Sequence, residues 1–234
     1  MKKLFTFPND FKIREDEVKN GLNGEITVQK FSYGYDMANR TSIINHLIHK
    51  YKLKDYLEIG TRDGYNFDNI IARNKIGVDP KPRNYFNNII IKTSDNFFIT
   101  NNIKFDLIFI DGLHLENQVD KDLSNSLNFL KKDGFVIMHD CNPPTEFHQR
   151  EIYEVNGKFP AWNGTVWRSY VKNRMYNKNL NMSCVDSDWG VGVIQVGNQK
   201  IFKSEKNLNY AFLKNNRRKL LNLISVKDFI KKFN

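Results

Sequence analysis

Hydrophobic runs alternate along most of the chain with segments whose apolar residues recur at helical spacing. The strongest run, Phe105–Ile110, is apolar at five of its six positions, which is typical of a strand buried on both faces of a parallel sheet. Shorter runs predict further strands within Tyr56–Gly64, Lys75–Pro80, Asn88–Lys92 and Phe135–Met138. Strands that alternate with helices in this way predict an α/β fold with a mostly parallel sheet.

The helical segments are recognised by apolar residues three or four positions apart. The segments are 37–51 with Ile43, Ile44, Leu47, Ile48 and Tyr51; the one after Gly64 with Phe67, Ile70 and Ile71; and the one before Asp133 with Val119, Leu123, Leu127 and Leu130. The first precedes the first strand, and the other two are expected to cross over between neighbouring strands.

The pattern changes after residue 142. Asn163 is placed to cap a helix that carries Val166, Trp167 and Tyr170 on one side. The runs Val191–Val196 and Lys200–Lys203, joined by Gly197-Asn198, predict an antiparallel hairpin. A last helix is expected to begin at Ser225, whose capping partner is Asp228.

Residues 1–36 show no clear period, and their segment FSYGYD could lie over a ligand. We therefore expect an N-terminal arm or lid over residues 1–36 and one domain over residues 37–234. A length of 234 residues suits a single domain with short appendages.

Composition excludes several classes of protein. A hydrophobic content of 40% is that of a globular chain, and no apolar run approaches the roughly 18 residues of a membrane span. The two cysteines give neither a disulfide framework nor zinc-ligand spacing, so a cytoplasmic location is expected. The net charge of +10 is spread along the chain apart from the cluster Lys214–Lys219, which disfavours nucleic-acid binding and suits an anionic small substrate.

The stretch Tyr56–Gly64 reads YLEIGTRDG and predicts a strand, a tight turn and a helix. A dinucleotide fingerprint needs a middle glycine between the outer two, and Thr61–Asp63 fill that gap here. Asp79 stands at the tip of the second strand, about 20 residues beyond Glu58, where such a sheet holds a ribose diol. The turn therefore suits a nucleoside ligand without phosphates at this position.

Glu58, Gly60, Gly64 and Asp79 together resemble the signature of class I S-adenosylmethionine (SAM)-dependent methyltransferases. The resemblance implies a Rossmann-like, doubly wound, mostly parallel seven-stranded sheet that closes with a C-terminal antiparallel hairpin. It implies SAM as cofactor, held by these four residues and by Asp111. It also implies adenine contacts from Ser94 and Asp95, although a capped helix start explains these two equally well.

Polar residues end two further strands, Asp111 after the fourth and His139-Asp140 after the fifth. By strand position Asp111 and Asp140 resemble the metal-binding acids of small O-methyltransferases such as the catechol and macrocin enzymes. Two carboxylates and water suit Mg²⁺ or another divalent metal. The departure is Cys141, which stands where the catechol enzyme has an asparagine ligand and is a poor ligand for hard cations. Without a metal, His139 or His114 is expected to take the hydroxyl proton, because histidine titrates near neutrality.

The segments IDGLH, VIMHDCNPP, WNGTVW and DSDWG resemble a bacterial branch of small O-methyltransferases associated with sugars and surface glycans. The resemblance implies methyl transfer to a hydroxyl of a sugar or nucleotide-linked sugar, with Trp162, Arg168 and His148 near the substrate and a homodimer as one assembly. The alternatives are a catalytically inactive SAM-fold scaffold, an NAD-dependent enzyme and an RNA methyltransferase. Base methylation is disfavoured because Asn142-Pro143-Pro144 follows the fifth strand and is completed by Thr145, not an aromatic residue.

Overall fold

The fold is known from a computed structural model, which describes residues 38–84, 87–201 and 207–234. One sheet runs through the described residues in the strand order β3-β2-β1-β4-β5-β7-β6-β8. The strands are β1 (Asp55–Ile59), β2 (Asn74–Val78), β3 (Ile89–Ile90), β4 (Phe105–Ile110), β5 (Leu130–Met138), β6 (Leu180–Val185), β7 (Val191–Val196) and β8 (Leu223–Ile224). The first five are parallel to one another, and β7 is antiparallel to both β5 and β6. The predicted α/β, Rossmann-like, mostly parallel sheet is confirmed, with β8 as one short strand beyond the expected seven.

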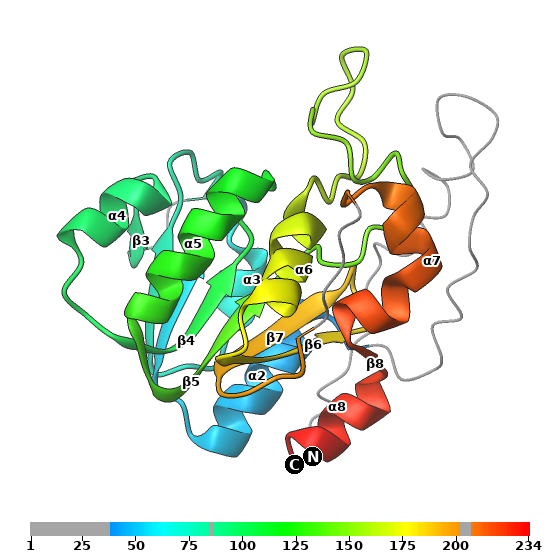
Figure 1. The fold of residues 1–234 in the computed structure, drawn as a ribbon. Coiled ribbons are helices and arrows are strands. Elements are labelled where there is room, and N and C mark those ends of the chain that lie inside the picture. The colour runs from blue at the N-terminus through cyan, green and yellow to red at the C-terminus, as the bar shows by residue number, and fades with distance from the viewer. Residues whose placement is uncertain (1–37, 85–86, 202–206) are drawn as a thin grey trace.

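Helices cover both faces of the sheet (Figure 1). They are α2 (Arg40–Tyr51), α3 (Tyr65–Asn69), α4 (Ser94–Thr100), α5 (Glu116–Asn128), α6 (Val166–Tyr176), α7 (Tyr210–Leu221) and α8 (Val226–Lys232). Helices α4 to α7 share one hydrophobic core with the sheet, whereas α2, α3 and α8 share the other. Alternate residues of β4 enter the two cores, with Ile108 on one side and Leu107 and Phe109 on the other. The prediction that this strand is buried on both faces is confirmed.

The closing hairpin lies elsewhere than predicted. Strand β7 pairs with β6, not with residues 200–203. Because β7 already lies between β5 and β6, neither of its edges can accept another strand. Lys200 and Ile201 are outside any strand, and residues 202 and 203 lie outside the described part of the chain.

Three predicted helix boundaries can be compared with the structure; two differ and one is confirmed. Helix α6 begins at Val166 after Thr165, so the predicted cap at Asn163 is wrong; the Asn163 amide donates instead to Asp140. Helix α3 ends at Asn69, before the apolar residues Ile70 and Ile71. The predicted cap of α8 is confirmed, since the Ser225 hydroxyl accepts from the backbone N–H of Asp228.

The arm or lid expected over residues 1–36 lies outside the described residues, and the domain expected over 37–234 stays a prediction. Among the described helices, none combines the length and the hydrophobicity that crossing a membrane requires.

Candidate active site

The turn after β1 is built from two glycines with left-handed backbone. Gly60 has φ +86° and Gly64 has φ +78°. A side chain at Gly60 would overlap the backbone carbonyl of Asp111 and lie 2.6 Å from Cα of Gly112. The turn therefore packs directly against the loop that follows β4, at the carboxyl edge of the sheet where ligands of such folds bind.

The two acids predicted beside this turn have different surroundings. Glu58 is 1% exposed and accepts hydrogen bonds from the Tyr56 hydroxyl (2.5 Å) and the Asn66 amide (2.8 Å). Burial outweighs these bonds and raises the pKa of Glu58 to about 8. Asp79 accepts from the backbone N–H groups of Arg62 (2.7 Å) and Lys81 (2.8 Å), which fixes its carboxylate at the tip of β2.

The raised pKa of Glu58 predicts how stability depends on pH. Between the ordinary carboxyl pKa of 4.5 and about 8, the folded protein keeps a proton that the unfolded chain has released. The free energy of unfolding should therefore decrease as pH rises through this window, by an amount on the order of a few kcal/mol. Glu58→Gln keeps the shape and removes the charge, so urea denaturation of this variant should show a flatter pH dependence. An unchanged slope would show that Glu58 does not hold this proton.

Ser94 and Asp95 begin α4 and face α5. The Gln118 amide donates to the Ser94 hydroxyl (3.2 Å) and to the Asp95 carboxylate (2.9 Å). Thr93, not Ser94, caps the helix, because its side chain accepts from the N–H of Asn96. The contact of Ser94 and Asp95 with adenine stays a prediction.

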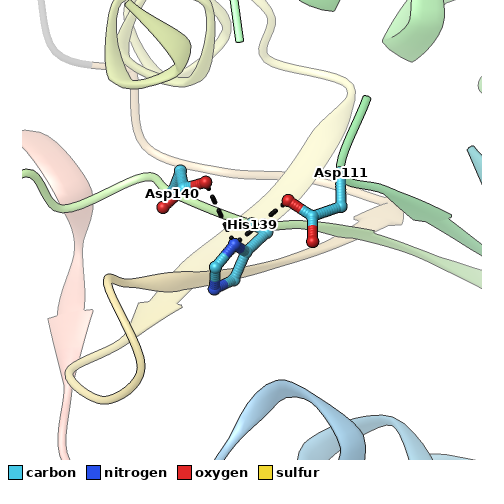
Figure 2. A group of neighbouring side chains, drawn as sticks. All are labelled: Asp111, His139 and Asp140. Atoms are coloured by element: carbon cyan, nitrogen blue, oxygen red, sulfur yellow. Dashed lines mark hydrogen bonds and ion pairs between the residues drawn. The ribbon is translucent and has the colours of Figure 1, made fainter. Parts of the chain in front are cut away.

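Asp111, His139 and Asp140 converge on one point at the carboxyl edge (Figure 2). Nδ1 of His139 lies 3.2 Å from Oδ1 of Asp111 and 3.1 Å from Oδ2 of Asp140. His139 is 3% exposed, and its Nε2 lies 2.8 Å from the backbone carbonyl of Asp188. Asp140 has left-handed backbone (φ +61°), and its carboxylate lies beside the ring of the histidine that precedes it. The structure thus joins the residues that the sequence placed at the ends of β4 and β5.

His114 completes this group from the loop after β4. Its Nε2 lies 3.4 Å from Oδ1 of Asp111, and its Nδ1 lies 3.2 Å from Oδ2 of Asp140 and 3.1 Å from the carbonyl of Trp162. About 18% of its side chain is exposed, against 2% for His139. His114 is therefore the more accessible of the two histidines.

Arg40 and Asp188 also belong to this group, although the sequence did not predict them there. The Arg40 guanidinium donates from Nη1 to Oδ2 of Asp111 (2.9 Å), and from Nε and Nη2 to the Asp188 carboxylate (2.9 and 3.1 Å). Asp188 belongs to the motif DSDWG, which was noted only for its resemblance, and Arg40 opens a helix recognised only by its apolar stripe. The sequence carried no signal that the two would meet.

The charges of this group shift its pKa values. Burial alone would raise the pKa of Asp111, but His139 and Arg40 together hold it well below its usual range. Burial and Arg40 lower the pKa of His139, whereas Asp140 and Asp111 outweigh them and raise it well above its ordinary value. Burial lowers the pKa of His114, and Asp140 and Asp111 again raise it overall.

The residues expected near the substrate lie in the connection between β5 and α6 and at the start of α6. Trp162 stacks on His114 (centroids 5.0 Å apart) and on Tyr153 (5.1 Å), which places it beside the site. His148 is 2% exposed, and its Nδ1 lies 2.7 Å from the Thr145 hydroxyl, so it packs within this connection.

Arg168 contacts Glu151 and Trp167. It pairs with the exposed Glu151 at 3.2 Å, and its guanidinium lies 5.9 Å from the ring of Trp167. Trp167 itself is completely buried, as its place on the apolar side of the helix predicted. None of these contacts tests the predicted substrate roles.

Comparison with known proteins finds similarity to methyltransferases. A family model described as a methyltransferase domain matches residues 57–141, which span the glycine turn, Asp111 and His139-Asp140. Over these residues the chain matches a methyltransferase domain, and its fold is that of class I SAM-dependent methyltransferases. No curated protein matches its sequence.

Solved structures share the fold of this methyltransferase domain at low sequence identity. The methyltransferase PaMTH1 of Podospora anserina, bound to S-adenosylhomocysteine, is 15% identical, with 85% of this chain and 100% of that chain covered and a TM-score of 0.54. The cofactor-bound protein Rv0187 from MTB is 10% identical, with coverage of 83% and 100% and a TM-score of 0.51. A protein from Klebsiella pneumoniae described provisionally as an O-methyltransferase is 13% identical, with coverage of 80% and 96% and a TM-score of 0.50.

Proposed function

We propose that the protein transfers the methyl group of SAM to a hydroxyl group of a sugar, a nucleotide-linked sugar or a related glycan precursor. The observation that carries this proposal is the group of Asp111, His114, His139 and Asp140 beside the glycine turn. Two carboxylates and two imidazoles at the carboxyl edge can bind, orient and deprotonate a hydroxyl group. The net charge of +10 favours an acceptor that bears phosphate.

In this proposal SAM lies along the carboxyl edge from β1 to β4. The tight turn at Gly60 and Gly64 leaves the backbone open to the methionine part of the cofactor. Asp79, fixed by two backbone N–H groups, accepts from the ribose hydroxyls. Glu58 binds Asn66 on α3, the helix that follows the turn. Asp111 lies beside the methyl group, and Ser94 and Asp95 contact the adenine ring.

His114 is the better placed base for the acceptor hydroxyl. Both nitrogens of His139 face oxygen acceptors in a buried position, which leaves it no approach to an acceptor. His114 holds its Nδ1 against the Trp162 carbonyl and Asp140, so Nε2 can take the hydroxyl proton beside Asp111. Asp111 then stabilises the imidazolium, and the hydroxyl oxygen attacks the methyl carbon in line with the departing sulfur. Positioning supplies most of the rate, because the methyl group of SAM is already activated.

Asp111, His139 and Asp140 also fit a divalent metal ion. Asp111, Asp140 and Asp188 bring three negative charges and Arg40 one positive charge, so with neutral histidines the group has the charge that a dication balances. Two ligands about 2.1 Å from an octahedral ion and at right angles lie about 3 Å apart, which matches the separations of 3.2 and 3.1 Å from Nδ1 of His139.

The second contact of His139 supports the same ligand set. Nε2 faces the Asp188 carbonyl, and a ligating histidine characteristically donates its other N–H to such a group. Cys141 takes no part, because it is completely buried and its thiol donates to the Met138 carbonyl. A bound Mg²⁺ or Mn²⁺ would lower the pKa of the acceptor hydroxyl and orient it.

Metal binding has a direct test in titration with Mn²⁺, followed by electron paramagnetic resonance. We expect Asp140→Asn to lower Mn²⁺ affinity at least about tenfold, since it removes one of two carboxylate ligands. Asp106→Asn is the matched control, because Asp106 lies at the opposite end of β4 and binds the N–H groups of Lys54 and Asp55. Equal affinity in the wild type and Asp140→Asn would exclude this metal site.

The proposed reaction is tested by incubating the protein with methyl-deuterated SAM and a panel of nucleotide sugars and hexose glycosides. The expected product is a labelled methyl ether, located by tandem mass spectrometry. A labelled methyl group found only on nitrogen would exclude hydroxyl transfer. Binding of S-adenosylhomocysteine without any labelled product from the panel would contradict the proposed acceptor class.

A further inference from the structure

We infer that Asp188 is a positioning residue, which fixes both His139 and Asp111 from the turn between β6 and β7. The inference concerns the site of the proposed function and rests on that assignment. It is tested by proton exchange at His139 and by Mn²⁺ affinity, and neither measurement requires the methyl acceptor to be known.

The turn has a backbone that its residues adopt only under constraint. Asp188 (φ +44°), Trp189 (φ +64°) and Gly190 (φ +86°) are left-handed in succession. Such a conformation is unusual for a bulky residue such as tryptophan, and it persists only where the surroundings determine it. Strained backbone beside charged groups at the sheet edge indicates that the turn has a role in the site.

Contacts on both sides hold the turn in place. The carbonyls of Trp189 and Gly190 accept from the N–H groups of Asn142 (2.8 Å) and Cys141 (3.0 Å). A side chain at Gly190 would lie 2.6 Å from the backbone nitrogen of Asn142, so the turn packs against the segment directly after His139-Asp140. Two backbone hydrogen bonds and close packing therefore join the turn to the end of β5.

Asp188 contacts the site through both its backbone carbonyl and its carboxylate. Its backbone carbonyl accepts from Nε2 of His139 at 2.8 Å, which keeps a proton on that nitrogen and directs Nδ1 at Asp111 and Asp140. Its carboxylate accepts from the backbone N–H of Arg40 (2.8 Å) and from the guanidinium. Arg40 in turn holds Oδ2 of Asp111, so Oδ1 is left to face the two histidines.

The side chain at position 188 therefore affects both the backbone of the turn and the contact with Arg40. Aspartate and asparagine tolerate left-handed backbone better than alanine does. Both can also accept a hydrogen bond from Arg40, whereas only aspartate balances its charge. Asp188→Ala should disturb the turn and the Arg40 contact together, and Asp188→Asn should restore most of the geometry.

The first measurement is the exchange of the Nε2 proton of His139 in protein labelled with ¹⁵N-histidine. The chain has five histidines, so the signal can be assigned by comparison with His139→Gln. We expect a slowly exchanging Nε2 proton in the wild type, exchange at least about tenfold faster in Asp188→Ala, and near wild-type exchange in Asp188→Asn. Asp186→Ala is the control, since Asp186 lies in the same turn but accepts only from the Asn142 amide among the contacts described.

The second measurement is Mn²⁺ affinity in the same variants. Asp188→Ala should bind Mn²⁺ about 10- to 100-fold more weakly, because Arg40 would then repel the ion and His139 would lose its orientation. If Asp188→Ala and Asp186→Ala lower the melting temperature alike while exchange and affinity stay at wild-type values, Asp188 is only structural and the inference is wrong. A wild type that binds no Mn²⁺ removes the metal from the proposed function, and His139 exchange then decides this inference alone.

Discussion

Asp111→Asn should lower methyl transfer by about 10²- to 10⁴-fold while the affinity for S-adenosylhomocysteine stays within a few-fold. Asp111 is the residue on which Arg40, His114 and His139 all converge. Asparagine keeps the shape but supplies no charge to stabilise an imidazolium at His114. One position of its amide would also direct N–H donors at groups that are themselves donors, so the orientation of both histidines should change.

The measurement compares transfer of labelled methyl from SAM with calorimetric binding of S-adenosylhomocysteine. Asp106→Asn is again the control, because Asp106 lies on β4, the strand that Asp111 follows, but at the edge of the sheet away from the site. Full activity in Asp111→Asn would remove the proposed mechanism. Loss of cofactor binding in parallel with activity would instead give Asp111 a role in holding SAM.

Local pattern was enough to predict the parallel part of the sheet. Strand β4 is apolar at nearly every position, and the structure buries it on both faces. The same pattern predicted that β4 ends before Asp111 and that β5 ends before His139-Asp140. Because neighbouring parallel strands end at one edge, the meeting of these acids with His139 could be expected from the sequence.

Contacts between distant segments could not be predicted in this way. Arg40 and Asp188 are 148 positions apart, and neither follows a predicted strand or belongs to the apolar stripe of a predicted helix. His114 and Trp162, 48 positions apart, meet because the end of the connection between β5 and α6 packs against the loop after β4, where the Thr165 N–H donates to the His114 carbonyl. The run Lys200–Lys203 was expected to pair with β7, and only the sheet order shows that β6 does. Charged partners across the sheet edge are set by tertiary packing, so a single sequence leaves them undetermined.

The meeting of Arg40 with Asp188 also bears on the proposed metal site. An arginine beside two candidate ligands would oppose a cation if its own charge were not balanced. Asp188 supplies that balance, since it accepts from both Nε and Nη2 of Arg40. The residue that orients His139 through its carbonyl therefore also keeps Arg40 from cancelling the negative charge of Asp111 and Asp140.

Gly60→Ala should abolish cofactor binding, a large effect for the addition of a single methyl group. Any side chain at position 60 requires the left-handed backbone, which costs roughly 1–2 kcal/mol for a residue with a Cβ. The added Cβ would also overlap the backbone carbonyl of Asp111. Backbone cannot move aside as a flexible side chain does, so the turn and the loop after β4 would have to separate.

Gly157→Ala separates these two causes. Gly157 has φ +71°, close to that of Gly60, but a Cβ there would meet no atom within 4 Å. Both variants carry the cost of left-handed backbone, and only Gly60→Ala disrupts the contact with Asp111. Urea denaturation first establishes that each variant folds, and calorimetry with S-adenosylhomocysteine then gives its affinity. We expect wild-type affinity in Gly157→Ala and no measurable binding in Gly60→Ala. Equal affinities would show that the close approach of Gly60 to Asp111 does not shape the cofactor site.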